Sequence, residues 1–268
     1  MRNLRREYLD LLDADKLEAA YQTFIEKHTS LVPREFELNH GIWASMVFRQ
    51  LPLGSSYKPD FAFITKSTVQ WRCVFVEIER PGFKFFGTSK ETPFDPHFNQ
   101  ALQQIGRWRA WFEEDGLAKA TQVFGPMLTF PQARDPVDVR FVLVYGRAAE
   151  LESNPQRRSW VRAEQREDLR IMSFDGLVEG LESKEELYLG AMHNEYVEVL
   201  SDTFLSWTLF QHMEPECIRV NESLFASAER AMSRNSGGES LLARWQAKHV
   251  QSGLERLKQF RPRRSRRG

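Results

Sequence analysis

The hydrophobic and polar positions of this chain alternate between strand-like runs and helix-like stripes. Segments rich in apolar residues, typical of buried strands, are found at 42–53, 61–64, 71–76, 139–145 and 170–174. Apolar residues at three- and four-residue spacing, typical of amphipathic helices, are found at 17–28 and 101–112. This order predicts an α/β fold in which a β-meander leads into a mixed sheet flanked by helices.

Polar residues and prolines mark the boundaries of this pattern. Asp15-x-x-Glu18 resembles a capping box that starts the first helix, and Pro33 ends it. The segment 81–96 contains glycine and proline, which are typical of a loop, together with Phe83, Phe85 and Phe86. These rings fit two interpretations, since they could stack on unpaired bases or anchor the loop to the core.

The C-terminal part of the sequence is predicted to be helical, with helices at 196–210, 224–232 and 241–260. These helices either pack on the preceding domain or pair with another subunit, so we expect a homo-oligomer. The expected organisation is an α/β domain with its N-terminal helix at 1–188, a helical region at 189–260 and a basic tail at 261–268.

Composition narrows the class of protein. With 268 residues and 41% hydrophobic content, the chain can bury a substantial core. Two cysteines, Cys73 and Cys217, make no disulfide framework, which suits a reducing compartment. The basic N-terminus is followed by no apolar stretch, and no run approaches the ~18 apolar residues of a membrane span. We therefore expect a cytoplasmic protein with no membrane partner.

The charged residues balance overall but not locally. Basic and acidic side chains number 37 each, and five arginines fall within the last eight residues, so the rest of the chain is acidic. This tail fits two interpretations, a contact with the phosphates of a nucleic acid or a solubilising end.

Three carboxylates stand at the ends of two predicted strands. Asp60 leads the run 61–64, and Glu77 and Glu79 close the run that begins at Trp71. Glu77 and Glu79 share one face of the strand, while the carbonyl of Ile78 between them can still face an ion. Oxygen ligands of this kind suit Mg²⁺ or Mn²⁺. Solvated surface carboxylates are the alternative, although the buried character of 71–76 favours charges with partners.

Five segments, in this order, resemble the C-terminal domain of the Shedu anti-phage defence proteins, a branch of the PD-(D/E)XK nucleases: LPLGSSYKPDFAF, WRCVFVEIERP, NQALQQIGRW, VRFVLVYGR and RIMSFDGL. The resemblance covers roughly residues 15 to 185. It implies a restriction-endonuclease-like mixed sheet and Mg²⁺- or Mn²⁺-dependent cleavage of DNA. By this resemblance Asp60 and Glu77 are metal ligands, and Gln104, four residues before Trp108, supports the site.

The chain departs from the family pattern at one position, where Glu79 stands in place of the usual lysine. Active enzymes of this superfamily with E-x-E use the second glutamate near the metal or as a general base. Candidate cations for a phosphate are Lys58, Lys84 and Arg147, each of which is otherwise a solvated or capping side chain. An acidic residue of the first helix often joins such sites, and Glu35 and Glu37 are the nearest candidates.

Two other functions remain open. Loss of the lysine would suit a nuclease-derived module that binds nucleic acid or regulates without cleaving. An Asp/Glu pair could also hydrolyse a glycosidic bond without metal, in which case EDTA would not inhibit it.

Overall fold

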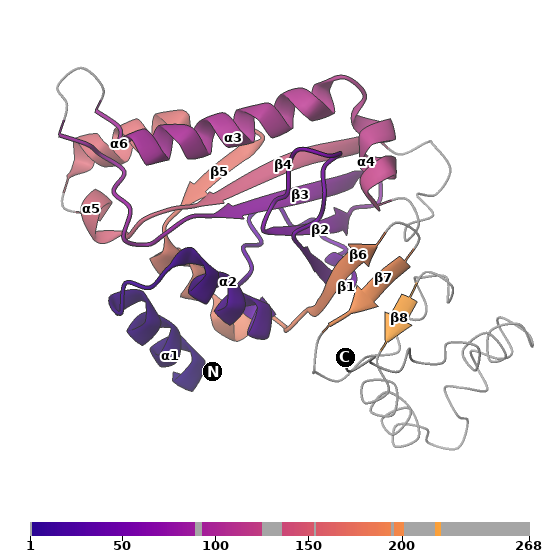
Figure 1. The fold of residues 1–268 in the computed structure, drawn as a ribbon, viewed down its shortest axis with the longest axis horizontal. Coiled ribbons are helices and arrows are strands. Elements are labelled where there is room, and N and C mark those ends of the chain that lie inside the picture. Colours follow the sequence, from indigo (N-terminus) through magenta and orange to yellow (C-terminus); the bar gives the residue numbers. More distant parts are fainter. Residues whose placement is uncertain are drawn as a thin grey trace, which may run out of the picture.

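The computed structural model describes residues 2–88, 93–124, 136–152, 154–193, 196–200 and 218–220. Within these ranges the strands form one mixed sheet in the order β5-β4-β3-β2-β1-β6-β7-β8 (Figure 1). The strands are β1 Ile42–Arg49, β2 Phe61–Lys66, β3 Trp71–Ile78, β4 Val137–Val144, β5 Leu169–Met172, β6 Tyr188–His193, β7 Tyr196–Val199 and β8 Ile218–Val220. The predicted α/β fold with a mixed sheet is confirmed.

The predicted meander forms the middle of the sheet. β1 pairs antiparallel with β2, and β2 pairs antiparallel with β3. β3, β4 and β5 then run parallel, and the two helices Pro96–Glu113 and Gly116–Phe124 lie between β3 and β4 in the sequence. On the other side, β6 pairs parallel with β1. The start of β2 therefore lies beside the end of β3, so residues about 17 positions apart in the sequence meet there.

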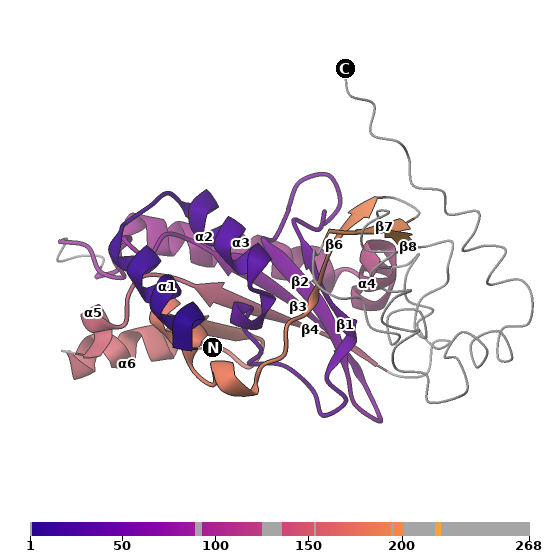
Figure 2. The same ribbon diagram turned by 90° about the horizontal axis from the view of Figure 1, so that it is seen from below.

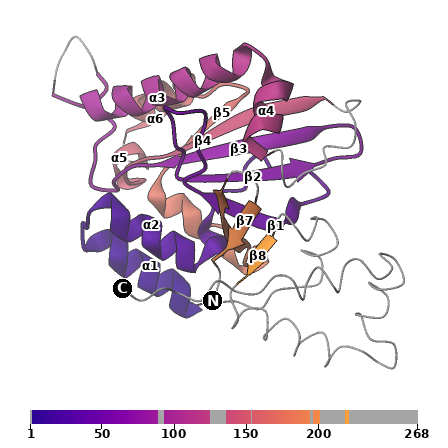
Figure 3. The same cartoon turned by 45° about the vertical axis from the view of Figure 1, so that its right-hand side comes forward.

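Helices cover both faces of the sheet (Figures 1 and 3). On one face, the apolar stripe of α3 packs on alternate residues of the strands, such as Phe75 and Phe141, and α4 and α6 extend this layer. On the opposite face, α1, α2 and η2 cover the other residues of the same strands, such as Val74 and Val142 (Figure 2). The helices are α1 Arg2–Asp13, α2 Glu18–Lys27, η1 Thr29–Leu31, α3 Pro96–Glu113, α4 Gly116–Phe124, α5 Ala149–Glu152, α6 Pro155–Glu164, η2 Phe174–Val178 and η3 Leu181–Ser183.

The N-terminal helices differ from the sequence prediction in two ways. Helix α1 was not predicted, although Tyr8 and Leu12 on it are buried and the Tyr8 hydroxyl donates to the Phe174 carbonyl at 3.1 Å. The predicted capping box is wrong: Leu17 is the N-cap of α2 and makes no side-chain cap. Asp15 lies in the left-handed region with φ of 39° and forms an ion pair with Arg80 at 3.7 Å.

The prediction of a helix that begins at residue 196 is also wrong, because Tyr196–Val199 forms β7, antiparallel to β6. The β-branched valines at 197 and 199 alternate with polar residues, which favours a strand once β6 offers an edge. Residues 188–199 thus extend the sheet. The helices predicted at 224–232 and 241–260 and the basic tail at 261–268 lie outside the described residues. Among the described helices, none combines the length and apolar character needed to cross a membrane.

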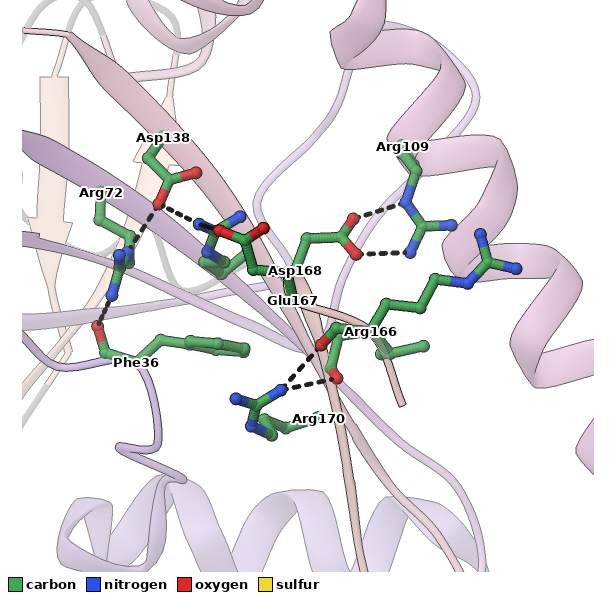
Figure 4. A network of polar contacts seen from close by, with 10 residues as sticks. Phe36, Arg72, Arg109, Asp138, Arg166, Glu167, Asp168 and Arg170 are labelled. Atoms are coloured by element: carbon green, nitrogen blue, oxygen red, sulfur yellow. Dashed lines mark hydrogen bonds and ion pairs between the residues drawn. The ribbon is translucent and has the colours of Figure 1, made fainter. Parts of the chain in front are cut away.

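Arginines from three parallel strands gather at their N-terminal ends (Figure 4). Asp138 accepts from Arg72 at 2.9 Å and pairs with Arg140 at 2.9 Å, and the guanidinium of Arg170 lies 5.1 Å from the centroid of the Phe36 ring. Asp138 is 24% exposed and each of its two arginines 15%. One carboxylate therefore neutralises two largely buried cations.

We expect Asp138→Asn to lower the free energy of unfolding by about 1–3 kcal/mol, because Arg72 loses its carboxylate partner and Arg140 keeps only the exposed carboxylate of Glu167. Urea denaturation measures this change. Glu167→Gln is the matched control, since the Glu167 carboxylate pairs with Arg140 at 3.3 Å but is 92% exposed. An equal loss in both variants would contradict the role given to Asp138.

Candidate active site at the ends of strands β2 and β3

Asp60 and Glu77 face each other across two strands. The antiparallel register sets Phe61 opposite Val76, and extending it by one residue sets Asp60 opposite Glu77. Both side chains are buried, with 8% of their surface exposed. On β3, Phe75 lies in the core under α3, so Glu77 points to the same face and Ile78 to the other. The alternation predicted for these residues is confirmed.

Three hydrogen-bond donors hold the two carboxylates. The Asp60 Oδ2 atom accepts from the Ile78 amide at 2.8 Å, and Oδ1 accepts from the Gln22 side chain at 3.2 Å. The amide of Gln104 on α3 donates to Glu77 Oε1. The other oxygen, Glu77 Oε2, is buried without a hydrogen-bond partner among the described residues. The pair is thus held from both helix layers, and one oxygen remains to be satisfied.

Burial and mutual repulsion disfavour charge on these groups. Burial raises the pKa of Asp60 to about 7, against the opposing effect of the Ile78 amide, and burial raises the pKa of Glu77 well above its ordinary value. Glu79 is half-buried, and burial followed by repulsion from Glu18 raises its pKa to about 7. The Glu18 carboxylate raises the pKa of all three. We call Asp60, Glu77, Glu79 and Glu18 the carboxylate cluster.

A helix contributes one acid to the carboxylate cluster. This residue is Glu18 of α2, which was not among the candidates predicted from the sequence. Glu18, Gln22 and Glu26 recur every four residues on α2, so they line one edge of the helix beside its buried stripe. The Glu26 carboxylate also raises the pKa of Asp60, and it forms an ion pair with Arg49 at 2.9 Å. Polar residues at helical spacing beside an apolar stripe could have identified this edge.

The sequence candidates Glu35 and Glu37 do not join the cluster. Both lie near Lys184, and Glu37 pairs with Arg34 at 4.0 Å.

The three predicted cations, Lys58, Lys84 and Arg147, have different surroundings. Lys58 and Lys84 are exposed. Arg147 forms ion pairs with Asp175 at 3.0 Å and with Asp13 at 3.1 Å, so its guanidinium bridges α1 and η2. A role for these residues in nucleic-acid binding stays a prediction. Burial raises the pKa of Glu18, and the charge of the Arg80 guanidinium lowers it.

The donor set fits a hard divalent cation. Asp60 and Glu77 supply two carboxylates, the number by which Mg²⁺ is commonly held, and Glu77 Oε2 is a buried oxygen that such an ion would satisfy. Gln22 and Gln104 orient the ligands, as supporting residues of metal sites do. In the described residues, no group of three or more His, Cys, Asp or Glu side chains is already arranged as a metal cluster. Coordination by the Ile78 carbonyl stays a prediction.

Ionising these carboxylates should cost the folded protein stability. Asp60 and Glu79 have pKa values of about 7 in the folded state, against an ordinary value of about 4. Between these values the folded state binds more protons than the unfolded state, so stability falls as pH rises from about 4 to about 7. We expect Asp60→Asn to raise the free energy of unfolding by about 1–4 kcal/mol at about pH 8 and to change it little at about pH 4.

Urea denaturation across this pH range, without divalent cations, measures the effect. Glu167→Gln is the control, because its exposed carboxylate should give the same small change throughout. A gain for Asp60→Asn that is independent of pH would contradict the assignment.

Comparison with known proteins identifies the family of this chain. No curated protein matches the sequence significantly. The family model described as "Shedu protein SduA, C-terminal" matches residues 15–178, a range that runs from the turn before α2 to the end of η2 and contains the whole carboxylate cluster. The chain therefore belongs to the Shedu family of anti-phage defence proteins and carries the family's C-terminal domain.

Proposed function

We propose that this domain is a metal-dependent DNA endonuclease of the PD-(D/E)XK type that acts in anti-phage defence by hydrolysing phosphodiester bonds. The observation that supports it best is the pair Asp60 and Glu77, buried opposite each other with one carboxylate oxygen unsatisfied. Two acids buried beside each other destabilise the fold, and a bound cation would offset their repulsion.

In this proposal Asp60 and Glu77 hold Mg²⁺ or Mn²⁺, with the Ile78 carbonyl as a further ligand. The bound ion would lower the pKa of a water molecule and neutralise charge on the phosphodiester. Gln104 fixes one oxygen of Glu77, so the other is free to bind. Gln22 and the Ile78 amide each hold one oxygen of Asp60, which orients this carboxylate. Glu79, partly exposed and two residues from Glu77, is the group that receives a proton from the attacking water.

The alternative is a nuclease-derived module that binds DNA without cleaving it. Glu79 occupies the position of the usual lysine, and both lysines nearest in sequence, Lys58 and Lys84, are exposed. Lacking a fixed cation at the phosphate, such a site would still bind metal and nucleic acid.

Removing either metal ligand should abolish metal binding and cleavage together. We expect Mn²⁺ at about 100 times its Kd to stabilise the wild type by about 2.7 kcal/mol and to leave Asp60→Asn and Glu77→Gln unchanged. Cleavage of plasmid DNA should fall at least about 100-fold in both variants. Thermal denaturation and a gel assay measure the two effects.

Glu114→Gln, an exposed carboxylate at the end of α3, is the control and should behave as wild type. Full cleavage by Asp60→Asn and Glu77→Gln would overturn the site. An EDTA-resistant wild type would favour a metal-free hydrolase.

Glu79 separates the enzyme from the binding module. If Glu79 serves catalysis, Glu79→Gln lowers the rate of cleavage and Glu79→Lys does not raise it. If the chain is a degenerate nuclease, Glu79→Lys supplies a cation at the phosphate and raises or creates cleavage. Plasmid cleavage by the wild type and both variants across a Mn²⁺ series measures this, and no cleavage by any of the three would count against the nuclease itself.

A further inference from the structure

The three phenylalanines of the loop after β3 fall into two classes. Phe85 and Phe86 are buried, and their amides donate to the Glu150 carboxylate at 2.9 and 3.2 Å. These two anchor the loop, one of the two predicted roles. Phe83 differs, because it is only partly buried and its ring lies parallel to the imidazole of His97, with 4.5 Å between the ring centroids and 6° between the planes.

His97 is the outer ring of this stack. It is exposed, in the first turn of α3, and its amide donates to the Asp95 carboxylate at 2.8 Å, which caps the helix. Phe83 is the inner ring, 6.2 Å from the ring of Tyr145. The guanidinium of Arg80 lies 5.3 Å from the centroid of Phe83. The exposed imidazole of His97 is therefore backed by a second ring, and near that inner ring lies the Arg80 guanidinium, which also pairs with Asp15 at 3.7 Å.

The backbone below Phe83 is fixed. Gly146 has φ of 58°, and a Cβ atom there would lie 3.0 Å from the Phe83 carbonyl oxygen and 2.9 Å from the Phe85 ring. The Tyr145 hydroxyl donates to the Lys84 carbonyl at 3.3 Å. The position of the stack is thus set by the end of β4 rather than by the loop alone.

One face of α3 links the stack to the carboxylate cluster, because His97 stacks on Phe83 and Gln104 donates to Glu77. His97 precedes Gln104 by seven residues, so both lie on one face of α3 about 10 Å apart along its axis. That spacing corresponds to about three base steps of a nucleic-acid strand. Tyr145, whose ring lies 6.2 Å from that of Phe83, is also close enough to Glu79 for this carboxylate to raise the pKa of its hydroxyl.

We propose that Phe83 and His97 form a stacking subsite for an unpaired base of a single-stranded nucleic acid, with Arg80 beside it for the backbone phosphate. This proposal rests on the proposed function, because it states that the DNA bound at the same site contains a single-stranded segment. Every base presents a π face, so the subsite is tolerant of sequence. In an intact duplex the bases are stacked on each other, and the subsite has nothing to receive.

Binding to a fluorescein-labelled thymidine oligonucleotide of about 12 nucleotides tests the subsite. Fluorescence anisotropy without divalent cations makes the measurement independent of cleavage. We expect His97→Ala to weaken binding about 5- to 100-fold, and His97→Phe to restore it, since base stacking on an aromatic ring is worth about 1–3 kcal/mol. Binding to a blunt duplex with a paired strand of the same length should not change in either variant.

His193→Ala is the matched control, because His193 is another exposed histidine that stacks on a ring, that of Tyr196, on the β6–β7 hairpin. It should bind as wild type. The subsite is overturned if the wild type does not bind the oligonucleotide, if His97→Ala binds it normally, or if His97→Ala weakens duplex binding equally or His193→Ala has the same effect. A protein that shows the expected binding but never cleaves DNA would overturn the endonuclease and keep the subsite.

Discussion

The arrangement of this domain depends on keeping two carboxylates buried at the end of an apolar sheet. Asp60 directly precedes β2 and Glu77 is the next-to-last residue of β3, and both strands are largely buried on both faces, so the two carboxylates are held away from bulk water. Their position requires α2 on one side, for Gln22, and α3 on the other, for Gln104. The two helical layers are therefore tied together through the acids as well as through the hydrophobic cores.

The central strands and α3 could be predicted because their apolar periodicity is strong and local. The apolar residues Phe75 and Val76 followed by Glu77 predict a buried strand with a polar end, and no knowledge of its neighbours is needed. The spacing of Ile105 and Trp108 likewise predicts which face of α3 is buried. The contact of Gln104 with Glu77 was indicated only by family resemblance. Nothing in the spacing of an amide beside an apolar stripe tells which strand it meets.

Other parts could not be predicted because they depend on tertiary contacts. Helix α1 carries arginines and carboxylates in equal number, and it is stabilised by the buried Tyr8, whose hydroxyl needs the Phe174 carbonyl of η2 in place. Tyr196–Val199 is a strand because β6 offers an edge that lies next to β1. Glu18 reaches the carboxylate cluster because α2 crosses the ends of the strands. For α1 and Glu18 the decisive neighbour is distant in sequence, and for β7 it is the adjacent strand β6, which is itself held by the distant strand β1.

The parallel pairing of β1 with β6 has a consequence for synthesis of the chain. The meander β1-β2-β3 can form as soon as its residues leave the ribosome, but Met46 and Val47 find their partners Tyr188 and Leu189 only about 140 residues later. Until then β1 is an apolar edge strand with unpaired amides and carbonyls, the kind of edge on which nascent chains associate. The arrival of β6 closes this edge, so the last part of the sheet to be made also protects the first.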